Sequence, residues 1–274
     1  MKKTAVERDD KDGLFAYAHH STEHPRFVEF KLHTHNDYEI YVFLKGDITF
    51  LVEGIKKKMS PYDIVLIRGN ELHNLLPNPN FEYERVVLNI SDDFFDVWNC
   101  GYIREIFSGS IASRFIPGEK IRIGGIDDDI RQIDKYIRET KDTDDTVVKC
   151  AIIEFLHDLS RISNDEEEED ENTTISEIIR YINQNLTQAI VLDELADRFF
   201  LSKYYMCRLF KKSTGFTINQ YIVNKRILLV KKMCKSGMNL SLASVEAGFG
   251  SYTNFYKAYV KEFGVSPGKG LKNR

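Results

Sequence analysis

The last third of the chain contains an internal repeat. The first copy reads Ser-x3-Met-x3-Phe-x4-Gly from Ser202 to Gly215, and the second reads Ser-x3-Phe-x3-Tyr-x4-Gly from Ser251 to Gly264. A serine that can cap a helix, apolar residues four positions apart and a closing glycine predict one helix in each copy. The repeat therefore restricts this region to an all-α domain.

A shorter predicted helix precedes each copy. Ala196 and Ser244 are small residues at the points where two helices must cross closely, and Gly248 falls in the second turn, where a left-handed backbone is often needed. A short helix, a tight turn and a capped second helix predict a helix-turn-helix, which is present twice here. The apolar positions of the short helices are Leu192, Leu195, Ala196 and Phe199 in the first unit and Leu240, Ala243, Ser244 and Ala247 in the second.

One long helix is predicted between the two units, from Ile218 to Lys235. At a rise of 1.5 Å per residue it would be about 27 Å long. A connector of that length could hold the two capped helices about 34 Å apart, which is one turn of DNA. Both helices could then enter successive major grooves on one face of a duplex.

Charge is distributed unevenly along the chain. From Thr173 onward there are 16 Lys and Arg residues and 6 Asp and Glu residues, whereas the preceding part has 22 basic and 36 acidic residues. An excess of positive charge at one end of a chain favours a polyanionic partner for that end. Together with the two helix-turn-helix units it predicts binding to double-stranded DNA.

The exposed faces of the two capped helices supply the candidate DNA-binding residues. An arginine can contact a guanine edge with two hydrogen bonds, and an asparagine can do the same for adenine. Lysines and helix N-termini can hold phosphates, which gives position but no sequence information. The candidates are Lys203, Tyr204, Cys207, Arg208 and Lys211 in the first unit and Tyr252, Thr253, Asn254, Tyr256 and Lys257 in the second.

The stretch GFGSYTNFYKAYVKEFGVSP from Gly248 to Pro267 resembles the signature of the AraC/XylS family of transcription regulators, and residues 174–267 resemble its DNA-binding domain. The resemblance implies that Arg226 is a structural ion-pair residue rather than a base reader. Cys207 and Tyr256 are poor hydrogen-bonding readers, which favours some readout by DNA shape. The base-reading positions that the resemblance implies are Tyr204, Cys207, Arg208, Tyr252, Thr253, Tyr256 and Lys257.

The acidic run NDEEEEDEN over residues 164–172 cannot bury apolar surface and is predicted to be a solvated linker. We therefore expect three segments. Residues 1–162 would form a sensing and dimerisation domain, residues 163–172 the linker, and residues 173–274 the DNA-binding domain.

The N-terminal region is predicted to be a small antiparallel β-barrel or sandwich, because short runs of β-branched and aromatic residues alternate with turns over residues 14–90. Helices are predicted after it, around the stripe Ile126, Ile130, Ile133 and Ile137 and around Val148, Ile152, Phe155 and Leu159. These helices could cap the barrel or pair with a second chain. The predicted fold class is α+β, and the predicted strands are 27–32, 38–44, 48–52, 63–67 and 83–90.

His33 and His35 would lie on one face of a strand, because side chains alternate along it. With Glu39 and Gly46 they form a pattern that resembles the first motif of the cupin family, and His73 fits its second motif loosely. The resemblance implies a cupin-like barrel that senses a ligand. Three histidines and a glutamate could also hold a divalent metal, but we expect hydrogen bonding or effector contact instead, and no cofactor.

Alternation along the same strand would place Tyr41 and Phe43 in the barrel interior with Glu39. Aromatic rings with a few polar groups suit a small amphipathic ligand such as a sugar, although each ring could equally be core. The candidate effector-binding residues are His33, His35, Glu39, Tyr41, Phe43 and His73.

These features predict a sequence-specific transcription regulator that responds to a small molecule, and we expect it to act as an activator. Two alternatives stay open: a metal-dependent cupin enzyme fused to a DNA-binding domain, and a ligand-independent regulator. We expect a homodimer, with RNA polymerase as a candidate partner, no membrane contact, and no enzymatic activity. Four widely spaced cysteines and the lack of a signal peptide or an apolar spanning run favour the cytoplasm.

Overall fold

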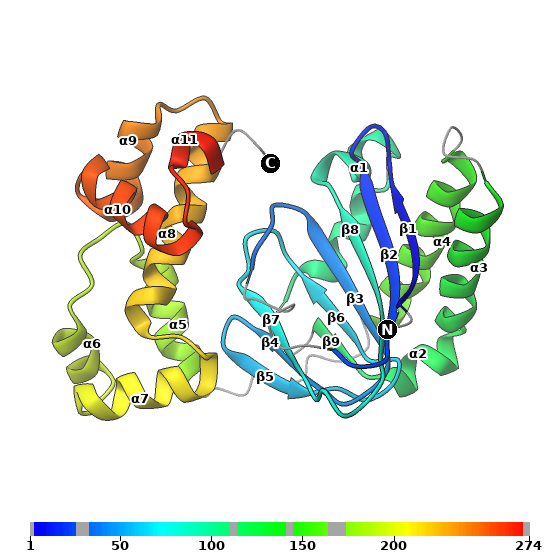
Figure 1. Ribbon diagram of the computed structural model, residues 1–274, viewed down its shortest axis with the longest axis horizontal. Helices are drawn as coiled ribbons and strands as arrows, with labels where there is room; N and C mark the ends of the chain where they lie inside the picture. Colours follow the sequence, from blue (N-terminus) through cyan, green and yellow to red (C-terminus); the bar gives the residue numbers. More distant parts are fainter. Residues whose placement is uncertain (1–2, 26–32, 110–113, 141–144, 164–173, 271–274) are drawn as a thin grey trace. The chain divides into compact units, whose positions relative to one another are not determined.

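The computed structural model describes residues 3–25, 33–109, 114–140, 145–163 and 174–270. The chain divides into two compact units, residues 1–171 and 172–274, which are described separately below (Figure 1). Over the described residues, no helix combines the length and the apolar character needed to cross a bilayer.

The N-terminal unit is built on two antiparallel sheets. The larger has the strand order β1-β2-β8-β3-β6-β9 and the smaller has the order β5-β4-β7. The predicted strand bounds 48–52 and 83–90 are confirmed, and the prediction for 27–32 falls outside the described residues. The strands are β1 (Lys3–Asp9), β2 (Phe15–Thr22), β3 (Tyr38–Lys45), β4 (Ile48–Val52), β5 (Ile55–Lys58), β6 (Ile64–Ile67), β7 (His73–Pro77), β8 (Tyr83–Ile90) and β9 (Phe115–Ile116).

The larger sheet separates two apolar cores, because strand residues alternate between its faces. Along β3, Ile40 and Val42 belong to one core, whereas Tyr41 and Phe43 belong to the other. The second core also contains Phe50 of the smaller sheet. The two sheets therefore enclose the interior that the alternating pattern of β3 predicted.

Helices cover the outer face of the larger sheet. The predicted stripe on α3, Ile126, Ile130, Ile133 and Ile137, is buried in the same core as Ile40 and Val42. The stripe thus caps the sheet within one chain, and pairing of these helices with a second chain, which capping does not exclude, stays a prediction. The helices are α1 (Asp92–Val97), the 3₁₀ helix η2 (Gly101–Phe107), α2 (Gly118–Gly124), α3 (Ile126–Glu139) and α4 (Thr146–Ser163).

The C-terminal unit is entirely helical. The connecting helix α8 has the bounds that the sequence predicts, and α7 and α10 are the two capped helices of the repeat. The fold class is α+β, as predicted. The helices are α5 (Thr174–Gln184), α6 (Leu192–Arg198), α7 (Lys203–Thr214), α8 (Ile218–Lys235), α9 (Leu240–Ser244), the π-helical turn η4 (Val245–Phe249), α10 (Tyr252–Phe263) and α11 (Pro267–Gly270).

Both capped helices begin and end as the repeat predicts. The hydroxyl of Ser202 accepts a hydrogen bond from the backbone N–H of Tyr205 at 3.3 Å, and that of Ser251 accepts one from Asn254 at 3.2 Å. Gly215 and Gly264 end the helices with φ of 81° and 71°. Each cap satisfies backbone groups that a helix end leaves unpaired.

Helix α8 packs against both helix-turn-helix units. Toward the first, Tyr221 contacts Phe210 of α7 edge-on, with ring centroids 5.7 Å apart. Toward the second, Ile227 and Val230 share a core with Phe255 of α10. Because α8 packs against both helix-turn-helix units, it holds them together.

The turn of the second unit needs glycine at position 248. Gly248 has φ of 92°, and a Cβ there would lie 2.9 Å from the carbonyl oxygens of Leu186 and Thr187. Arg226 fills the same space, since its Nε donates to the carbonyl oxygen of Leu186 at 2.8 Å and its Nη2 to that of Gln188 at 2.6 Å. Arg226 is therefore structural, as expected, but it binds backbone carbonyls where an ion pair was expected.

Candidate DNA-binding surface and effector site

The recognition helices α7 and α10 turn their buried faces inward and present the candidate DNA-binding residues outward. Met206 and Phe210 are buried in α7, and Phe255 and Tyr259 are buried in α10. Cys207 is half-buried, and the other candidates are exposed: Lys203, Tyr204, Arg208, Lys211, Tyr252, Thr253, Asn254, Tyr256 and Lys257.

The exposed side chains of α7 are organised around Tyr204 and Arg208. They lie one helical turn apart, and the guanidinium carbon of Arg208 is 5.9 Å from the centre of the Tyr204 ring. Tyr204 is 77% exposed. A guanidinium beside an aromatic face is restricted in orientation but keeps its donors for another partner.

Two of the candidates have partners inside the protein. Lys203 forms an exposed ion pair with Asp193 of α6 at 2.9 Å. Asn254 donates from its Nδ2 to the carbonyl oxygen of Phe249 at 3.1 Å. One N–H of the Asn254 amide is thus engaged at the start of α10, which ties the orientation of this amide to the turn.

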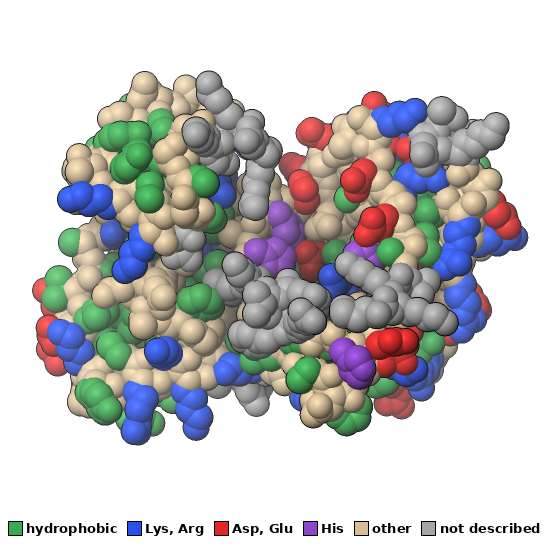
Figure 2. Space-filling model, viewed as in Figure 1, with side chains coloured by type: hydrophobic (Ala, Val, Ile, Leu, Met, Phe, Trp, Pro, Cys, Tyr) green, Lys and Arg blue, Asp and Glu red, His purple; other side chains and the backbone are tan. Residues whose placement is uncertain are grey.

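The surface charge agrees with the sequence. On the face drawn in Figure 2, acidic side chains gather mainly over the N-terminal unit, while basic side chains are spread over the C-terminal unit. Lys211 and Lys212 lie in the last turn of α7, and Lys261 lies in the last turn of α10. These cations could neutralise phosphates on either side of a recognition helix.

A second cluster of polar side chains lies in the N-terminal unit. One ligand atom from each of His33, His35, Glu39 and His73 lies within 4.8 Å of the others. His33 and His35 precede β3, Glu39 belongs to β3, and His73 begins β7 of the other sheet. An isolated β-bridge pairs His33 with His73, so the backbone holds the two imidazoles together.

Hydrogen bonds to the backbone orient two of these imidazoles. Nδ1 of His35 lies 2.9 Å from the carbonyl oxygen of Asp37, and Nδ1 of His73 lies 3.0 Å from that of Glu71. Because a carbonyl oxygen only accepts, each Nδ1 must carry the proton. Both Nε2 atoms face the cluster, where a charged ring donates to Glu39 and a neutral ring would present the lone pair of Nε2.

The Nε2 atoms of the three histidines lie close to one another and to the carboxylate of Glu39. Those of His33 and His73 are 3.1 Å apart, and Oε2 of Glu39 lies 2.7 Å from Nε2 of His35 and 3.4 Å from that of His73. Burial raises the pKa of the Glu39 carboxyl, but the charge of His73 and the hydrogen bonds from His35 and His73 outweigh it and leave the pKa below its ordinary value. Imidazole nitrogens and one carboxylate are ligands that divalent transition metals accept, so these residues fit such an ion.

Tyr41 and Phe43 share the face of Glu39 but lie in the closed core. They are 1% and 0% exposed, and the Tyr41 hydroxyl is hydrogen-bonded to that of Tyr83 at 2.6 Å. Their assignment to an effector site stays a prediction that needs the interior to open. The open surface of the cluster belongs to His33 and His35, since Glu39 and His73 are buried.

The residues that hold His73 in place could not be predicted from the sequence. The carboxylate of Glu71 binds the guanidinium of Arg114 through both oxygens, at 2.6 and 2.7 Å, while the Glu71 carbonyl holds Nδ1 of His73. Arg68 donates to the carbonyl oxygens of Phe107 and Gly109. The segment 68–73 therefore links the cluster to η2 and β9. Arg114 is far from Glu71 in sequence, and no local pattern pairs them.

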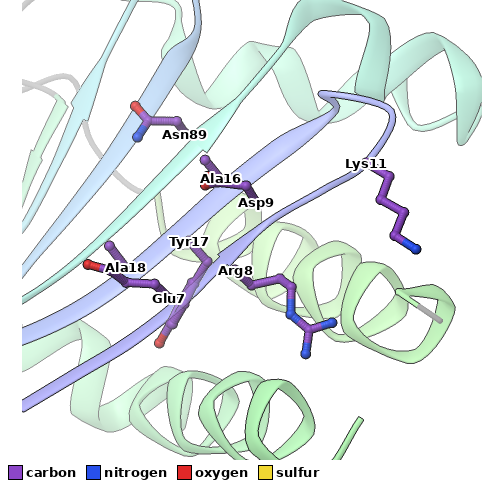
Figure 3. A pocket seen from close by; sticks show the side chains of 8 residues that line it. All are labelled: Glu7, Arg8, Asp9, Lys11, Ala16, Tyr17, Ala18 and Asn89. Atoms are coloured by element: carbon purple, nitrogen blue, oxygen red, sulfur yellow. The ribbon is translucent and has the colours of Figure 1, made fainter. Parts of the chain in front are cut away.

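A separate pocket of about 580 Å³ lies over β1, β2 and β8 (Figure 3). Arg8 and Tyr17 point from these strands toward the helices, where they bind Asp145 and Asp134. The residues that line it are Glu7, Arg8, Asp9, Lys11, Ala16, Tyr17, Ala18 and Asn89. The candidate effector residues are absent from the described lining of this pocket.

Two comparisons with known proteins match the C-terminal unit alone. A family model described as a helix-turn-helix domain matches residues 195–273. A stretch of 91 residues is 34% identical to LumQ of Photobacterium leiognathi, a probable transcriptional regulator, and covers 33% of this chain and 37% of LumQ.

Other relatives match along most of the chain. An uncharacterised helix-turn-helix-type transcriptional regulator, YdeC of Bacillus subtilis, is 21% identical over 246 residues, which cover 86% of this chain and 84% of YdeC. The transcriptional activator RhaS of Yersinia pseudotuberculosis is 22% identical and covers 87% and 88%. The solved structure of ToxT from Vibrio cholerae aligns with 94% of this chain and 98% of its own at 15% identity, with a TM-score of 0.39.

Proposed function

We propose that this chain, which is similar over most of its length to helix-turn-helix transcription regulators and matches a helix-turn-helix domain over residues 195–273, is a DNA-binding transcription regulator of the AraC/XylS type. It would recognise a specific DNA site with α7 and α10, and the His33, His35, Glu39 and His73 cluster would control this binding. The observation that supports control by the cluster is that four ligand atoms converge within 4.8 Å of one another. The occupant of the cluster is then the effector, or part of the effector's site.

The DNA-reading half rests on the exposed faces of the two recognition helices. The N-terminal residues of a recognition helix contact base edges when the helix lies in the major groove. Arg208 has the fork of donors that suits guanine, and Lys211 suits a phosphate. The 18-residue α8 joins the two units through a single helix, which favours one fixed spacing between them.

We propose that a divalent transition-metal ion occupies the cluster, in place of the metal-free cluster expected from the sequence. Three histidines and one glutamate would hold it. The carbonyl oxygens of Asp37 and Glu71 orient two of the imidazoles from outside, which is the usual arrangement around metal-bound histidines. The ion would supply an open position at the exposed edge of the cluster, where a small molecule with oxygen donors could bind.

Two alternatives predict different results. A metal-dependent enzyme would turn over a substrate at the cluster without any effect on DNA binding. A ligand-independent regulator would bind DNA equally well whatever the cluster holds. The similarity to transcription regulators over most of the chain favours a regulatory role without catalysis. A homodimer and contact with RNA polymerase stay predictions, and sedimentation of the full chain tests the first.

The test uses the full chain and a duplex obtained by selecting bound fragments of genomic DNA. Metal content is measured after dialysis against Mn²⁺, Fe²⁺, Co²⁺, Ni²⁺ or Zn²⁺, and the dissociation constant for the duplex is measured with and without the ion. We expect one ion per chain and a changed dissociation constant. Glu39→Gln should abolish both effects, whereas Glu7→Gln, at an exposed carboxylate of β1, should leave them intact. No bound metal, or the same constant in both states, would refute control by a metal.

A further inference from the structure

The second recognition helix offers DNA a different chemistry from the first. The repeat aligns Arg208 of α7 with Lys257 of α10, and it aligns Cys207 with Tyr256. Lysine presents a compact charge and lacks the planar fork with which arginine makes two hydrogen bonds to guanine. The position that reads guanine in the first unit is therefore poorly suited to do so in the second.

The amide of Asn254 is held by the protein itself. One of the two N–H groups on its Nδ2 donates to the carbonyl oxygen of Phe249, and its backbone N–H is taken by the hydroxyl of Ser251. Asn254 thus acts in the N-terminal cap of α10.

Apolar groups dominate the rest of this face. Tyr252 and Tyr256 are 38% and 41% exposed, and their ring centroids lie 6.2 Å apart, one helical turn from each other. The Tyr252 ring also contacts the buried ring of Phe255 at 6.1 Å. Phe255 thus holds the Tyr252 ring and the Tyr252 ring lies against Tyr256, so the exposed edges form a continuous apolar surface. Thr253 adds a methyl group between them in sequence.

The major groove contains one apolar group that such a surface can read, the C5-methyl group of thymine. Aromatic edges and a threonine methyl gain free energy by removing that methyl from water, and they gain nothing comparable from a guanine or cytosine edge. We propose that α10 reads thymine methyl groups through Tyr256, Tyr252 and Thr253. The half-site under the second unit is then specified by A·T pairs, and the half-site under the first by a guanine that Arg208 contacts. This inference rests on DNA binding by the C-terminal unit.

Replacing thymine by deoxyuridine removes only the methyl group and tests the inference directly. The full chain first selects its site from a random-sequence duplex library. The half-site whose base preference relaxes in Arg208→Ala is assigned to α7, and the other half-site to α10. Deoxyuridine is then placed at each thymine of the α10 half-site. Each contacted methyl should contribute about fourfold in affinity, the equivalent of about 0.8 kcal/mol per buried carbon group.

Variants tie the methyl effect to the proposed residue. In Tyr256→Ala, thymine and deoxyuridine duplexes should bind equally at the position that Tyr256 contacts. Tyr256→Phe should keep the fourfold preference, because it keeps the ring edge and removes only the hydroxyl. Thermal unfolding of both variants should match that of the parent chain. Deoxyuridine in the α7 half-site should have no effect that depends on Tyr256.

Equal affinity of the parent chain for thymine and deoxyuridine duplexes at every position of the α10 half-site would overturn the inference. A second half-site specified by G·C pairs would also overturn it. Both results leave sequence-specific DNA binding intact, whereas failure to select any site would refute the underlying function.

Discussion

The carboxylate of Glu71 and the guanidinium of Arg114 form a two-pronged ion pair in which Arg114 is only 2% exposed. The same Glu71 holds Nδ1 of His73 through its backbone carbonyl. Removing one partner of such an ion pair leaves the other charge uncompensated in the protein, which destabilises the folded state. The geometry of the cluster therefore depends on Arg114, a residue that does not belong to it.

Arg114→Met should destabilise the N-terminal unit by up to about 3 kcal/mol, because it leaves the half-buried Glu71 carboxylate with the backbone N–H of Arg68 but without its charged partner. It should also weaken metal binding about 10–100-fold, the usual effect of losing an outer support. Urea unfolding and metal titration measure the two effects. Arg131→Met is the matched control, since Arg131 is 65% exposed and its ion pairs with Asp127 and Asp128 should contribute little to stability in solvent. Equal effects of the two changes would contradict the assigned role of Arg114.

Arg208→Ala should cost about 1–3 kcal/mol in binding to the selected site and relax specificity at one base position. Lys211→Ala is the contrasting change. It should weaken binding to all sequences alike and reduce the dependence of affinity on salt by about one phosphate contact. Fluorescence anisotropy at several salt concentrations separates the two patterns. A uniform loss for Arg208→Ala would remove Arg208 from the base-reading set.

Asp129→Asn should stabilise the N-terminal unit at neutral pH. Burial, and then the charges of Asp158 and Glu154, raise the pKa of Asp129 to about 6, so its ionised form is unfavourable in the folded state. Solvent screening limits the gain to about 1 kcal/mol. The gain should disappear below about pH 4, where the carboxyl is protonated in both states. Thermal unfolding at pH 8 and pH 4 tests this, with the exposed Asp128→Asn as a control that should not stabilise.

His19 should make the N-terminal unit less stable as the pH rises. Its Nδ1 lies 2.6 Å from Asp134 of α3 and its Nε2 lies 2.9 Å from Glu84 of β8. Burial lowers its pKa, but the hydrogen bond and charge of Asp134, followed by those of Glu84, outweigh it and raise the pKa above 6.5. With a raised folded-state pKa, the stabilisation is complete below about pH 6.5 and is lost as the pH passes through the raised value. His19→Gln should flatten this part of the pH profile of unfolding. An unchanged profile would show that His19 does not bridge α3 to the sheet.

Sequence periodicity was sufficient wherever one local pattern determines an element. The bounds of α8 and of β4 and β8 agree with it, because caps and turns lie next to the apolar runs. The short strand β9 was not anticipated, because two residues carry no period. A tight turn is predicted in the first unit, but its left-handed residue is not. It has Phe200 in a left-handed conformation with φ of 55° and 96% exposed, where a glycine or asparagine is the usual signal.

The residues of the candidate site could be predicted from the sequence, but the contacts that position them could not. The pattern of His33, His35 and Glu39 named the right residues, but the expected strand alternation is not what gathers them, since His33 and His35 precede β3 and only Glu39 lies in it. The pairing of His33 with His73 depends on a bridge between distant segments. The engagement of Asn254 by Phe249 depends on the local turn, which residue types alone do not specify.

Paired reading of DNA by two units on one connector is tested most directly by changing the spacing between the two half-sites. Inserting five base pairs rotates one half-site to the opposite face of the duplex, because a turn of DNA has about 10.5 base pairs. We predict that the full chain loses most of its affinity for this duplex, because the single helix α8 joins the two units at one spacing. Equal binding to the original and the five-base-pair-shifted duplex would contradict simultaneous reading by α7 and α10.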